Sequence, residues 1–235
     1  MRLDIYLTKN FKVQSRNKAA ELINNKKIQI DGKIISKPSF KVEEDMQIKI
    51  LQDEFFVSRA AYKLKYFLEE LKLDIKNQNA LDIGSSTGGF TQVLLLNDIK
   101  SVTCVDVGSN QLHETIKDDK RIIKKENTDI RKFQSDEIYD IVTCDVSFIS
   151  ILNIIDDINR LANDKIIILY KPQYEVGSNI KRDSYGVVKD KIALNKARDK
   201  FIAKTIEYRW NLQYSQESKL AGKKGNIEEL FYFKK

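Results

Sequence analysis

The alternation of apolar and polar residues over the first 50 positions predicts a small unit of two helices and a few short strands. Residues 3–10 and 15–27 are predicted to form the helices, with Ser15 as the N-cap of the second. Apolar residues then alternate on both sides of Asp31-Gly32, a dipeptide typical of a tight hairpin. Residues 40–51 supply further strand, so this part of the chain is expected to be α+β.

From about residue 59 the apolar period becomes that of an α/β domain. Leu64, Phe67, Leu68 and Leu71 have the spacing of an amphipathic helix. Strand-like and helical runs then alternate, with strands expected at 80–84, 101–108, 121–127, 139–148 and 165–173, a long helix at 188–210 and a closing pair of runs at 212–220 and 227–235. This order predicts a Rossmann-like fold, with a mostly parallel sheet, helices on both faces and a final antiparallel hairpin.

The expected domains are residues 1–52 and 63–235, joined by a linker at residues 53–62. His113, the only histidine, is expected on the surface of a helix after the second strand of the larger domain. Trp210, at the end of the long helix, is expected in the core.

Charge divides the chain in the same way as the apolar pattern. The 235 residues carry a net charge of +7, and the first 50 contain 11 basic against 6 acidic residues, a net charge of +5. A basic module attached to a nearly neutral domain is the pattern of a nucleic-acid anchor beside a separate activity.

Two cysteines are too few for a disulfide framework or a zinc site. Cys104 and Cys144 both lie in strand-like runs and are expected to be small core residues. The chain shows no secretory signal and no apolar run long enough to span a membrane, so a cytoplasmic protein with no membrane partner is expected.

The run LDIGSSTGGF, residues 81–90, has the form of a strand, a glycine turn and a helix. A phosphate-binding P-loop requires a lysine after the last glycine, where this chain has Phe90. A dinucleotide fingerprint requires a second glycine where this chain has Ser86. Both phosphate-binding alternatives are therefore disfavoured.

The remaining pattern, D-x-G-x-x-x-G-G, suits S-adenosylmethionine, which carries no phosphate. Asp82 is placed to bind an amine, and the glycines allow the ligand to approach the backbone. Asp106 follows Gly84 by 22 residues, the spacing expected of an acid that binds a ribose hydroxyl. Asp129 is either an acceptor for the adenine amino group or the acid of a surface turn. No metal is expected.

Four charged residues are expected at one cleft. Asp145 and Lys171 end the fourth and fifth strands, where ligands of such sheets bind. Glu228 or Glu229 opens the last strand at the same edge, and Lys63 lies on the apolar flank of the first helix. Singly each has the alternative of a surface charge, but together they indicate a site. The run DVSF after the fourth strand lacks the prolines typical of amino methyltransferases, which favours an oxygen acceptor.

These motifs resemble known families. RLDIYL, SRNKAAELI and IQIDGKIISKPS are similar to the RNA-binding module typified by ribosomal protein S-four, and the remainder resembles FtsJ-type ribose methyltransferases. Their order, with VSRAAYKL between them, resembles the TlyA family. This resemblance implies 2′-O-methylation of a cytidine in ribosomal RNA, with S-adenosylmethionine as cofactor and ribosomal RNA or an assembled ribosomal subunit as partner.

The resemblance also implies roles for particular residues. The Lys-Asp-Lys-Glu tetrad of FtsJ-type enzymes falls on Lys63, Asp145, Lys171 and Glu228. The cofactor-binding positions fall on Asp82, Gly84, Ser85, Thr87, Gly88, Gly89, Phe90, Asp106 and Asp129. The chain has SRAA where the family usually has SRGG, which places the loop before Lys63 in doubt. It resembles the short form of the family, which implies that the large-subunit RNA is the favoured substrate.

In the expected mechanism Lys171 accepts the hydroxyl proton or aligns the acceptor oxygen. Asp145 orients Lys171, Glu228 orients Lys63, and Lys63 contacts the target ribose or a phosphate. RNA phosphates are expected to contact exposed cations, for which a solvated surface is the alternative. The candidates are Arg2, Arg16, Lys18, Lys37, Arg59, Lys181 and Arg182.

Two other classes of function remain as alternatives. A pore-forming haemolysin predicts a membrane-spanning or strongly amphipathic segment. A non-catalytic RNA-binding scaffold predicts no need for four charged residues at strand ends.

Overall fold

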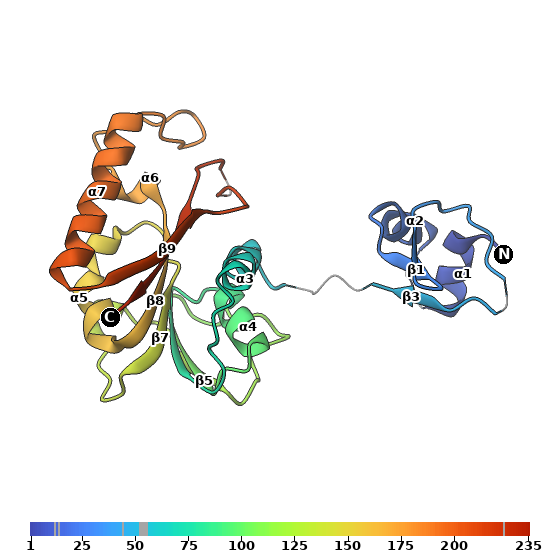
Figure 1. Ribbon diagram of the computed structural model, residues 1–235, viewed down its shortest axis with the longest axis horizontal. Coiled ribbons are helices and arrows are strands. Elements are labelled where there is room, and N and C mark those ends of the chain that lie inside the picture. Colours follow the sequence, from blue (N-terminus) through green and yellow to red (C-terminus); the bar gives the residue numbers. More distant parts are fainter. Residues whose placement is uncertain (12, 14, 44, 52–55, 223) are drawn as a thin grey trace. The chain divides into compact units, whose positions relative to one another are not determined.

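A computed structural model describes residues 1–235 except residues 12, 14, 44, 52–55 and 223. The chain forms two compact units, Met1–Phe55 and Phe56–Lys235 (Figure 1). Of the expected linker, residues 53–55 lie outside the described part of the chain, and residues 59–62 belong to the first helix of the second unit.

The first unit packs two helices against a three-stranded antiparallel sheet of order β2-β1-β3. Its elements are α1 Leu3–Asn10, α2 Arg16–Asn24, β1 Ile28–Ile30, β2 Lys33–Ile35 and β3 Ile48–Ile50. Ser15 caps α2 by accepting a hydrogen bond from the Lys18 amide. Asp31 and Gly32 form the hairpin turn with φ of 48° and 79°, as the sequence predicts.

The second unit contains a seven-stranded sheet of order β6-β5-β4-β7-β8-β10-β9. Its strands are β4 Asn79–Ile83, β5 Ser101–Val105, β6 Ile122–Lys125, β7 Tyr139–Cys144, β8 Ala162–Tyr170, β9 Asn211–Glu217 and β10 Glu229–Lys234. The first five are parallel, and β10 is antiparallel to both β8 and β9. This confirms the expected α/β fold with a final hairpin.

Helices cover both faces of this sheet. They are α3 Arg59–Leu71, α4 Gly89–Leu96, α5 Ile155–Leu161, the short α6 Pro172–Glu175 and α7 Lys191–Glu207. One apolar core holds α3 and α4 against one face, and a second holds α5 and α7 against the other. Cys104 lies in the first core and Cys144 in the second, both as free thiols, and Trp210 is also buried.

The helix expected at His113 is wrong. Residues 106–121, all of which the structure describes, connect β5 to β6 through turns. The amide of His113 donates to the Thr87 carbonyl, and the buried side chains of Leu112 and Ile116 lie close to Gly88. This segment therefore covers the glycine turn as irregular chain, and its apolar residues do not need a helix to reach the core.

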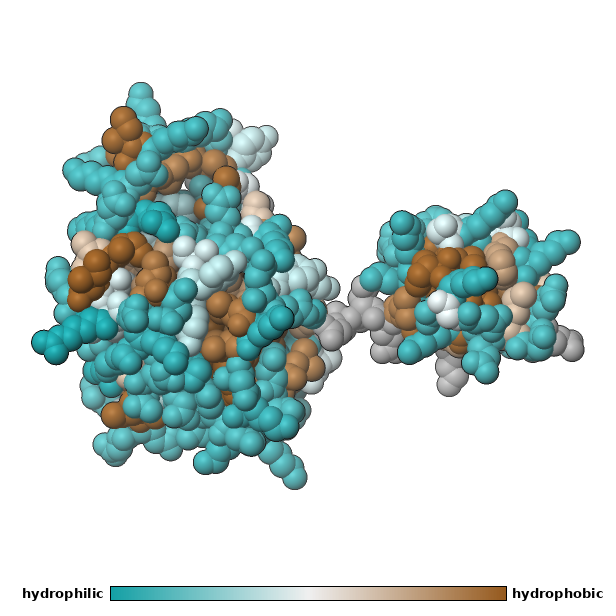
Figure 2. All heavy atoms as spheres, viewed as in Figure 1, coloured by the Kyte–Doolittle hydropathy of each residue, from teal (hydrophilic) through white to brown (hydrophobic). Residues whose placement is uncertain are grey.

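Hydrophilic residues predominate on the surface in view. The face shown in Figure 2 is mostly hydrophilic on both units, with separate apolar patches between charged side chains. None of the helices that the structure describes is long and apolar enough to cross a membrane.

Candidate active site

The glycine turn connects β4 to α4 at the carboxyl edge of the sheet. Gly84 has a φ of 77°, and a Cβ at this position would lie 2.8 Å from the Asp145 carbonyl oxygen. Only glycine fits both the backbone conformation and this close approach. The turn therefore lies directly against the end of β7, which carries Asp145.

Asp106 holds the turn in place. Its carboxylate accepts hydrogen bonds from the Ser86 amide and the Gly108 amide, each at 2.8 Å. Ser86 has a φ of 46°, so the carboxylate stabilises a left-handed residue within the turn. Each carboxylate oxygen has more than one lone pair, so Asp106 retains acceptor capacity towards the cavity that it lines.

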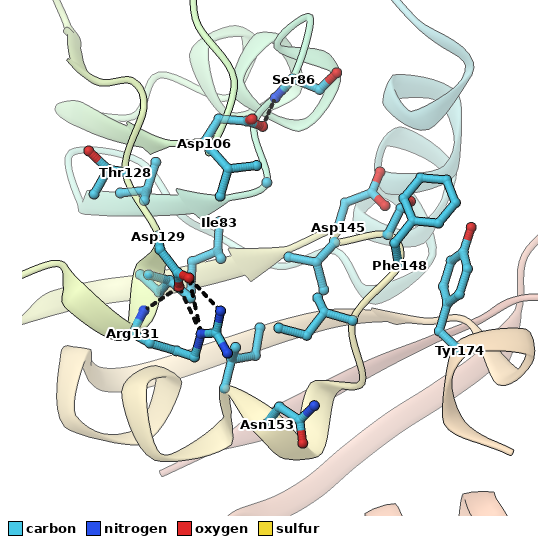
Figure 3. A pocket seen from close by; sticks show the side chains of 18 of the residues that line it. Ile83, Ser86, Asp106, Thr128, Asp129, Arg131, Asp145, Phe148, Asn153 and Tyr174 are labelled. Carbon is cyan, nitrogen blue, oxygen red and sulfur yellow. Dashed lines mark hydrogen bonds and ion pairs between the residues drawn. The ribbon is translucent and has the colours of Figure 1, made fainter. Parts of the chain in front are cut away.

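A cavity of about 880 Å³ extends along the carboxyl ends of β4, β5 and β7 (Figure 3). Its size lies in the range of small-molecule and cofactor sites. Its charged lining residues are Asp106, Asp129, Asp145 and Arg131. Of the predicted cofactor residues, Gly84, Asp106 and Asp129 line this cavity.

Asp129 is engaged by Arg131 within the cavity wall. The Arg131 guanidinium donates to both carboxylate oxygens, and the Arg131 amide donates to Oδ1 (Figure 3). The guanidinium holds the pKa of Asp129 at about 2. Asp129 is therefore a fixed, ionised acceptor at the edge of the cavity.

A second cavity of about 180 Å³ adjoins the first and shares Gly84, Ser86, Asp145 and Ser147 with it. Among the predicted cofactor residues, Ser85, Thr87, Gly89 and Phe90 line this smaller cavity. Gly88, the N-cap residue of α4, has a φ of 86° and lines neither of the two.

Asp82 requires a correction. The expectation was that its carboxylate binds the amine of the ligand, but the side chain has 0% exposure and lines neither cavity. It accepts hydrogen bonds from the hydroxyls of Thr91 at 2.6 Å and Thr143 at 2.9 Å. Burial raises the pKa of Asp82 to about 6. The carboxylate ties β4 to α4 and β7 beneath the turn.

The four residues of the tetrad form two ion pairs. Lys171 Nζ lies 2.5 Å from Asp145 Oδ1 and donates to Ser147 Oγ at 2.9 Å. Lys63 donates to Glu228, and the two are 8% and 4% exposed. Lys171 and Asp145 line the smaller cavity, whereas Lys63 and Glu228 line neither.

Strand register connects the two pairs. Glu229 of β10 lies opposite Tyr170 of β8, so Glu228 and Lys171 leave the sheet at the same edge. The sequence left Glu228 and Glu229 open as alternatives. Glu228 faces Lys63, whereas Glu229 binds Arg198 of α7 through two hydrogen bonds of 2.7 Å.

The loop before Lys63 adopts a regular helical start despite the SRAA departure. Ala60 and Ala61 belong to the first turn of α3, and Ala60 lines the smaller cavity. A Cβ on Gly89 would lie 2.1 Å from Ser58 Oγ and 3.1 Å from the Ala61 amide nitrogen. Gly89 of the glycine turn, which has no side chain, thus allows α3 to pack closely on α4.

The structure adds an aromatic pair that sequence reasoning did not single out. Phe148 is 89% exposed with a φ of 66°, and its ring centroid lies 5.3 Å from that of Tyr174. Both line the larger cavity, at the end away from Asp106 (Figure 3). The sequence offers only a phenylalanine after the fourth strand as a signal, because its exposure depends on the backbone of the loop.

Glu175 was also missed. Its carboxylate accepts hydrogen bonds from Ser150 Oγ at 2.5 Å and from the Ile151 amide at 2.9 Å. It thereby joins α6, which carries Tyr174, to the loop after β7, which carries Phe148. Burial raises the pKa of Glu175.

The predicted RNA-binding cations differ in how far they are already engaged. Arg2 and Arg16 both bind the buried Asp4 and hold its pKa well below its usual range. Lys18 pairs with Glu21 on the surface, and Lys37 is exposed.

In the second unit the exposed Arg59 donates to the Ala221 carbonyl. Lys181 is exposed. Arg182 donates to the carbonyls of Gln173, Gly177, Ser178 and Ile180. These hydrogen bonds use the guanidinium to stabilise its own loop, a role that the sequence did not indicate.

Comparisons with known proteins agree with this geometry. Residues 56–235 match the model of FtsJ-like methyltransferases, and residues 1–48 match that of the S4 domain. The chain is 46% identical to the 23S rRNA (cytidine-2′-O)-methyltransferase TlyA of Campylobacter jejuni over 99% of both chains. It is 32% identical to the 16S/23S rRNA (cytidine-2′-O)-methyltransferase TlyA of Mycobacterium tuberculosis over 99% of this chain and 89% of the relative.

A solved structure from Streptococcus thermophilus, which carries a hemolysin name, superposes with a TM-score of 0.72 at 28% identity. The match covers 100% of this chain and 88% of that one. The chain belongs to the TlyA family, with an S4 domain followed by an FtsJ-like methyltransferase domain.

Proposed function

We propose that this chain transfers a methyl group from S-adenosylmethionine to the ribose 2′-hydroxyl of a cytidine in ribosomal RNA, with the large-subunit RNA as substrate. The names of the two TlyA relatives support this reaction. The relative at 46% identity is named for 23S RNA alone, whereas the one at 32% is named for both RNAs, which supports the large subunit.

The charge of the larger cavity is the observation that carries the cofactor assignment. Of the three carboxylates that line it, Asp129 is paired with Arg131 and Asp145 with Lys171, so Asp106 is left without an ion pair among the described residues. A wall with this negative excess disfavours a phosphate-bearing ligand and suits S-adenosylmethionine, whose sulfonium and ammonium outweigh its carboxylate. Asp106 would hold the ribose hydroxyls and Asp129 the adenine amino group.

Acceptor chemistry is assigned to the smaller cavity. S-adenosylmethionine, when bound, supplies a methyl group activated by a positively charged sulfur. The transfer needs the acceptor oxygen in line with the methyl group, so positioning supplies much of the rate. Lys171, fixed between Asp145 and Ser147, aligns the hydroxyl oxygen as an ammonium, and it accepts the hydroxyl proton only as the neutral amine. The Lys63–Glu228 pair fixes the neighbouring edge of the sheet.

Phe148 and Tyr174 support a nucleoside acceptor. An aromatic ring held almost entirely in solvent beside a cavity offers a stacking surface for a base. The target cytosine would swing out of its RNA helix and stack on these rings, at the end of the larger cavity away from Asp106. The exposed lysines of the S4 domain would contact RNA phosphates and position the substrate without reading its sequence.

The site of methylation is tested by its resistance to alkali. Purified protein is incubated with isolated ribosomal subunits and S-adenosylmethionine labelled in the methyl group, and the RNA is then hydrolysed in alkali. A 2′-O-methyl group blocks cleavage of the adjacent phosphodiester, so the label is expected in alkali-resistant dinucleotides. Label in mononucleotides would place the methyl group on a base and contradict the proposal.

A further inference from the structure

Two loops of the methyltransferase unit are locked together beside the tetrad. One, residues 176–190, connects α6 to α7, and the other, residues 218–228, connects β9 to β10; of these, all but residue 223 are described. Asn226 is 6% exposed and joins them, since its side chain donates to the Gly186 carbonyl and accepts from the Val188 amide. Figure 1 shows them as the orange and dark red loops. They are called the loop pair below.

The first loop has a fixed conformation. Arg182 donates to four main-chain carbonyls, and Asp183 Oδ1 accepts from the amides of Tyr185 and Val187, each at 3.0 Å. Tyr185 sits on the turn that these bonds fix and is 71% exposed. A large aromatic side chain on a rigid support loses little conformational entropy when it binds a partner.

Two exposed cations belong to the same loop pair as this ring. Gly186 follows Tyr185, and a Cβ on Gly186 would lie 4.0 Å from Lys224 Nζ, so the Lys224 ammonium reaches across from the second loop. Lys181 is exposed in the first loop. Neither Lys181 nor Lys224 forms an ion pair with any residue that the structure describes. An exposed ring and available ammonium groups on one rigid loop pair match the chemistry that binds single-stranded nucleic acid.

The loop pair is continuous with the acceptor site. Glu228 ends the second loop and holds Lys63, and Arg59 of α3 donates to the Ala221 carbonyl in the same loop. The first loop starts directly after α6, whose Tyr174 lines the larger cavity. A nucleotide bound at the loop pair would therefore lie close to the target nucleotide along the RNA strand.

We propose that the loop pair binds the RNA strand next to the target nucleotide, with Tyr185 stacking on a base and Lys181 and Lys224 contacting phosphates. This proposal rests on the proposed function and adds a second RNA contact to that of the S4 domain. The large exposed apolar side chains of the loop pair are Tyr185 and Ile227, a smaller apolar surface than a protein partner would need, so RNA is favoured.

Binding to isolated large ribosomal subunits, without cofactor, tests the proposal separately from the reaction. Tyr185→Ala is expected to weaken binding by roughly 5- to 100-fold, the range for loss of one aromatic–base stack. Tyr185→Trp should bind within about threefold of the unaltered protein, because it keeps the stacking surface. Ile138→Ala removes another exposed apolar side chain, ahead of β7 at the opposite edge of the sheet, and should have no effect.

Two further measurements address charge and the identity of the partner. Lys181→Ala with Lys224→Ala should reduce the slope of log affinity against log salt by about 2. Ultraviolet crosslinking of the complex should attach a nucleotide to Tyr185. Tyr185→Ala binding within twofold of the unaltered protein would overturn the proposal, and so would a crosslink from Tyr185 to a ribosomal protein. Intact binding without methyl transfer would instead count against the proposed function alone.

Discussion

At the scale of single residues, Asp82 places an ionisable group where no water reaches it. The carboxylate lies under the cofactor turn with the Thr91 and Thr143 hydroxyls as its hydrogen-bond donors. Burial is the main cause that raises its pKa to about 6, and the two hydroxyls oppose the shift. The folded protein therefore binds the Asp82 proton more tightly than the unfolded chain does.

Asp82→Asn should change how stability depends on pH. An unfolded aspartate titrates near 3.9, so between about pH 4 and 6 the folded state holds more protons at this site. As the pH rises through this window, the free energy of unfolding of the natural protein should fall by about 3 kcal/mol at most relative to that of the variant. The difference between the two free energies should be constant above about pH 7. Urea unfolding of both proteins from pH 4 to 8 measures it. If the free energy of unfolding of the natural protein rose with pH relative to that of the variant, Asp82 would not be a buried group that retains its proton.

Lys171 is the residue on which the proposed chemistry depends. Lys171→Ala should lower the single-turnover methylation rate by about 100-fold or more, the range for a positioned proton acceptor. Its affinity for S-adenosylmethionine should stay within about threefold, because Lys171 lines only the smaller cavity. Calorimetry and single-turnover assays separate the two effects.

Lys165→Ala is the matched control for Lys171. Lys165 lies on β8, the strand that Lys171 directly follows, and pairs with Asp164, away from the carboxyl edge. Its loss should leave the rate unchanged. A Lys171→Ala rate within threefold of the natural protein would remove Lys171 from the mechanism.

At the scale of elements, the cofactor turn also determines how two helices pack. Gly89 begins α4, and the start of α3 lies so close that a Cβ would meet Ser58 and the backbone of Ala61. The helix that carries Lys63 is therefore positioned by the same turn that lines the smaller cavity.

Gly89→Ala should destabilise the second unit by about 1–3 kcal/mol, since it overpacks a close contact. Ser58→Ala removes the nearest atom, so the double variant should recover part of the loss. Urea unfolding of the single and double variants gives the coupling. Equal stability of Gly89→Ala and the natural protein, or losses that simply add in the double variant, would show that this contact does not limit the packing of α3 on α4.

Much of the element order could be predicted because period and turn chemistry agree along the chain. The Asp31-Gly32 hairpin, the amphipathic α3 and the closing hairpin all carry strong local signals. The segment around His113 misled because buried apolar residues in irregular chain have no distinct period. Helix α7 begins only at Lys191 because Asp190 caps it by accepting from the Ala193 amide.

The sequence predicts which types of residue form the site, but it predicts less well the directions in which their side chains point. Strand β4 is buried on both faces, so apolar alternation cannot show which way Asp82 points. The pairing of Lys63 with Glu228 depends on strand register between β8 and β10, which no local pattern specifies. Phe148 was missed because its exposure follows from a left-handed backbone in a loop.

At the scale of the whole molecule, most of the excess positive charge and the two cavities lie in different units. The apolar core of the first unit contains only residues of Met1–Phe55, and those of the second unit begin with Phe56. Each unit therefore has the buried apolar residues it needs to fold. The net charge of +5 in the first 50 residues places most of the excess positive charge on the S4 domain.

Removal of residues 1–55 should separate cofactor binding from RNA binding. The remaining chain should bind S-adenosylmethionine within about twofold of the full protein, because both cavities are lined by the second unit alone. Its affinity for the large subunit should fall, together with the salt dependence of binding, since phosphate contacts are lost. Calorimetry and binding at several salt concentrations measure this. Unchanged RNA affinity would contradict the anchoring role of the S4 domain.

The most direct test of the central claim is the product itself. Isolated small and large ribosomal subunits are incubated with S-adenosylmethionine and either the natural protein or Lys171→Ala, and the RNA is digested to nucleosides for mass spectrometry. New 2′-O-methylcytidine is expected in the large-subunit RNA with the natural protein and not with Lys171→Ala. Methylation of another nucleoside, or no 2′-O-methylcytidine in either subunit, would contradict the account.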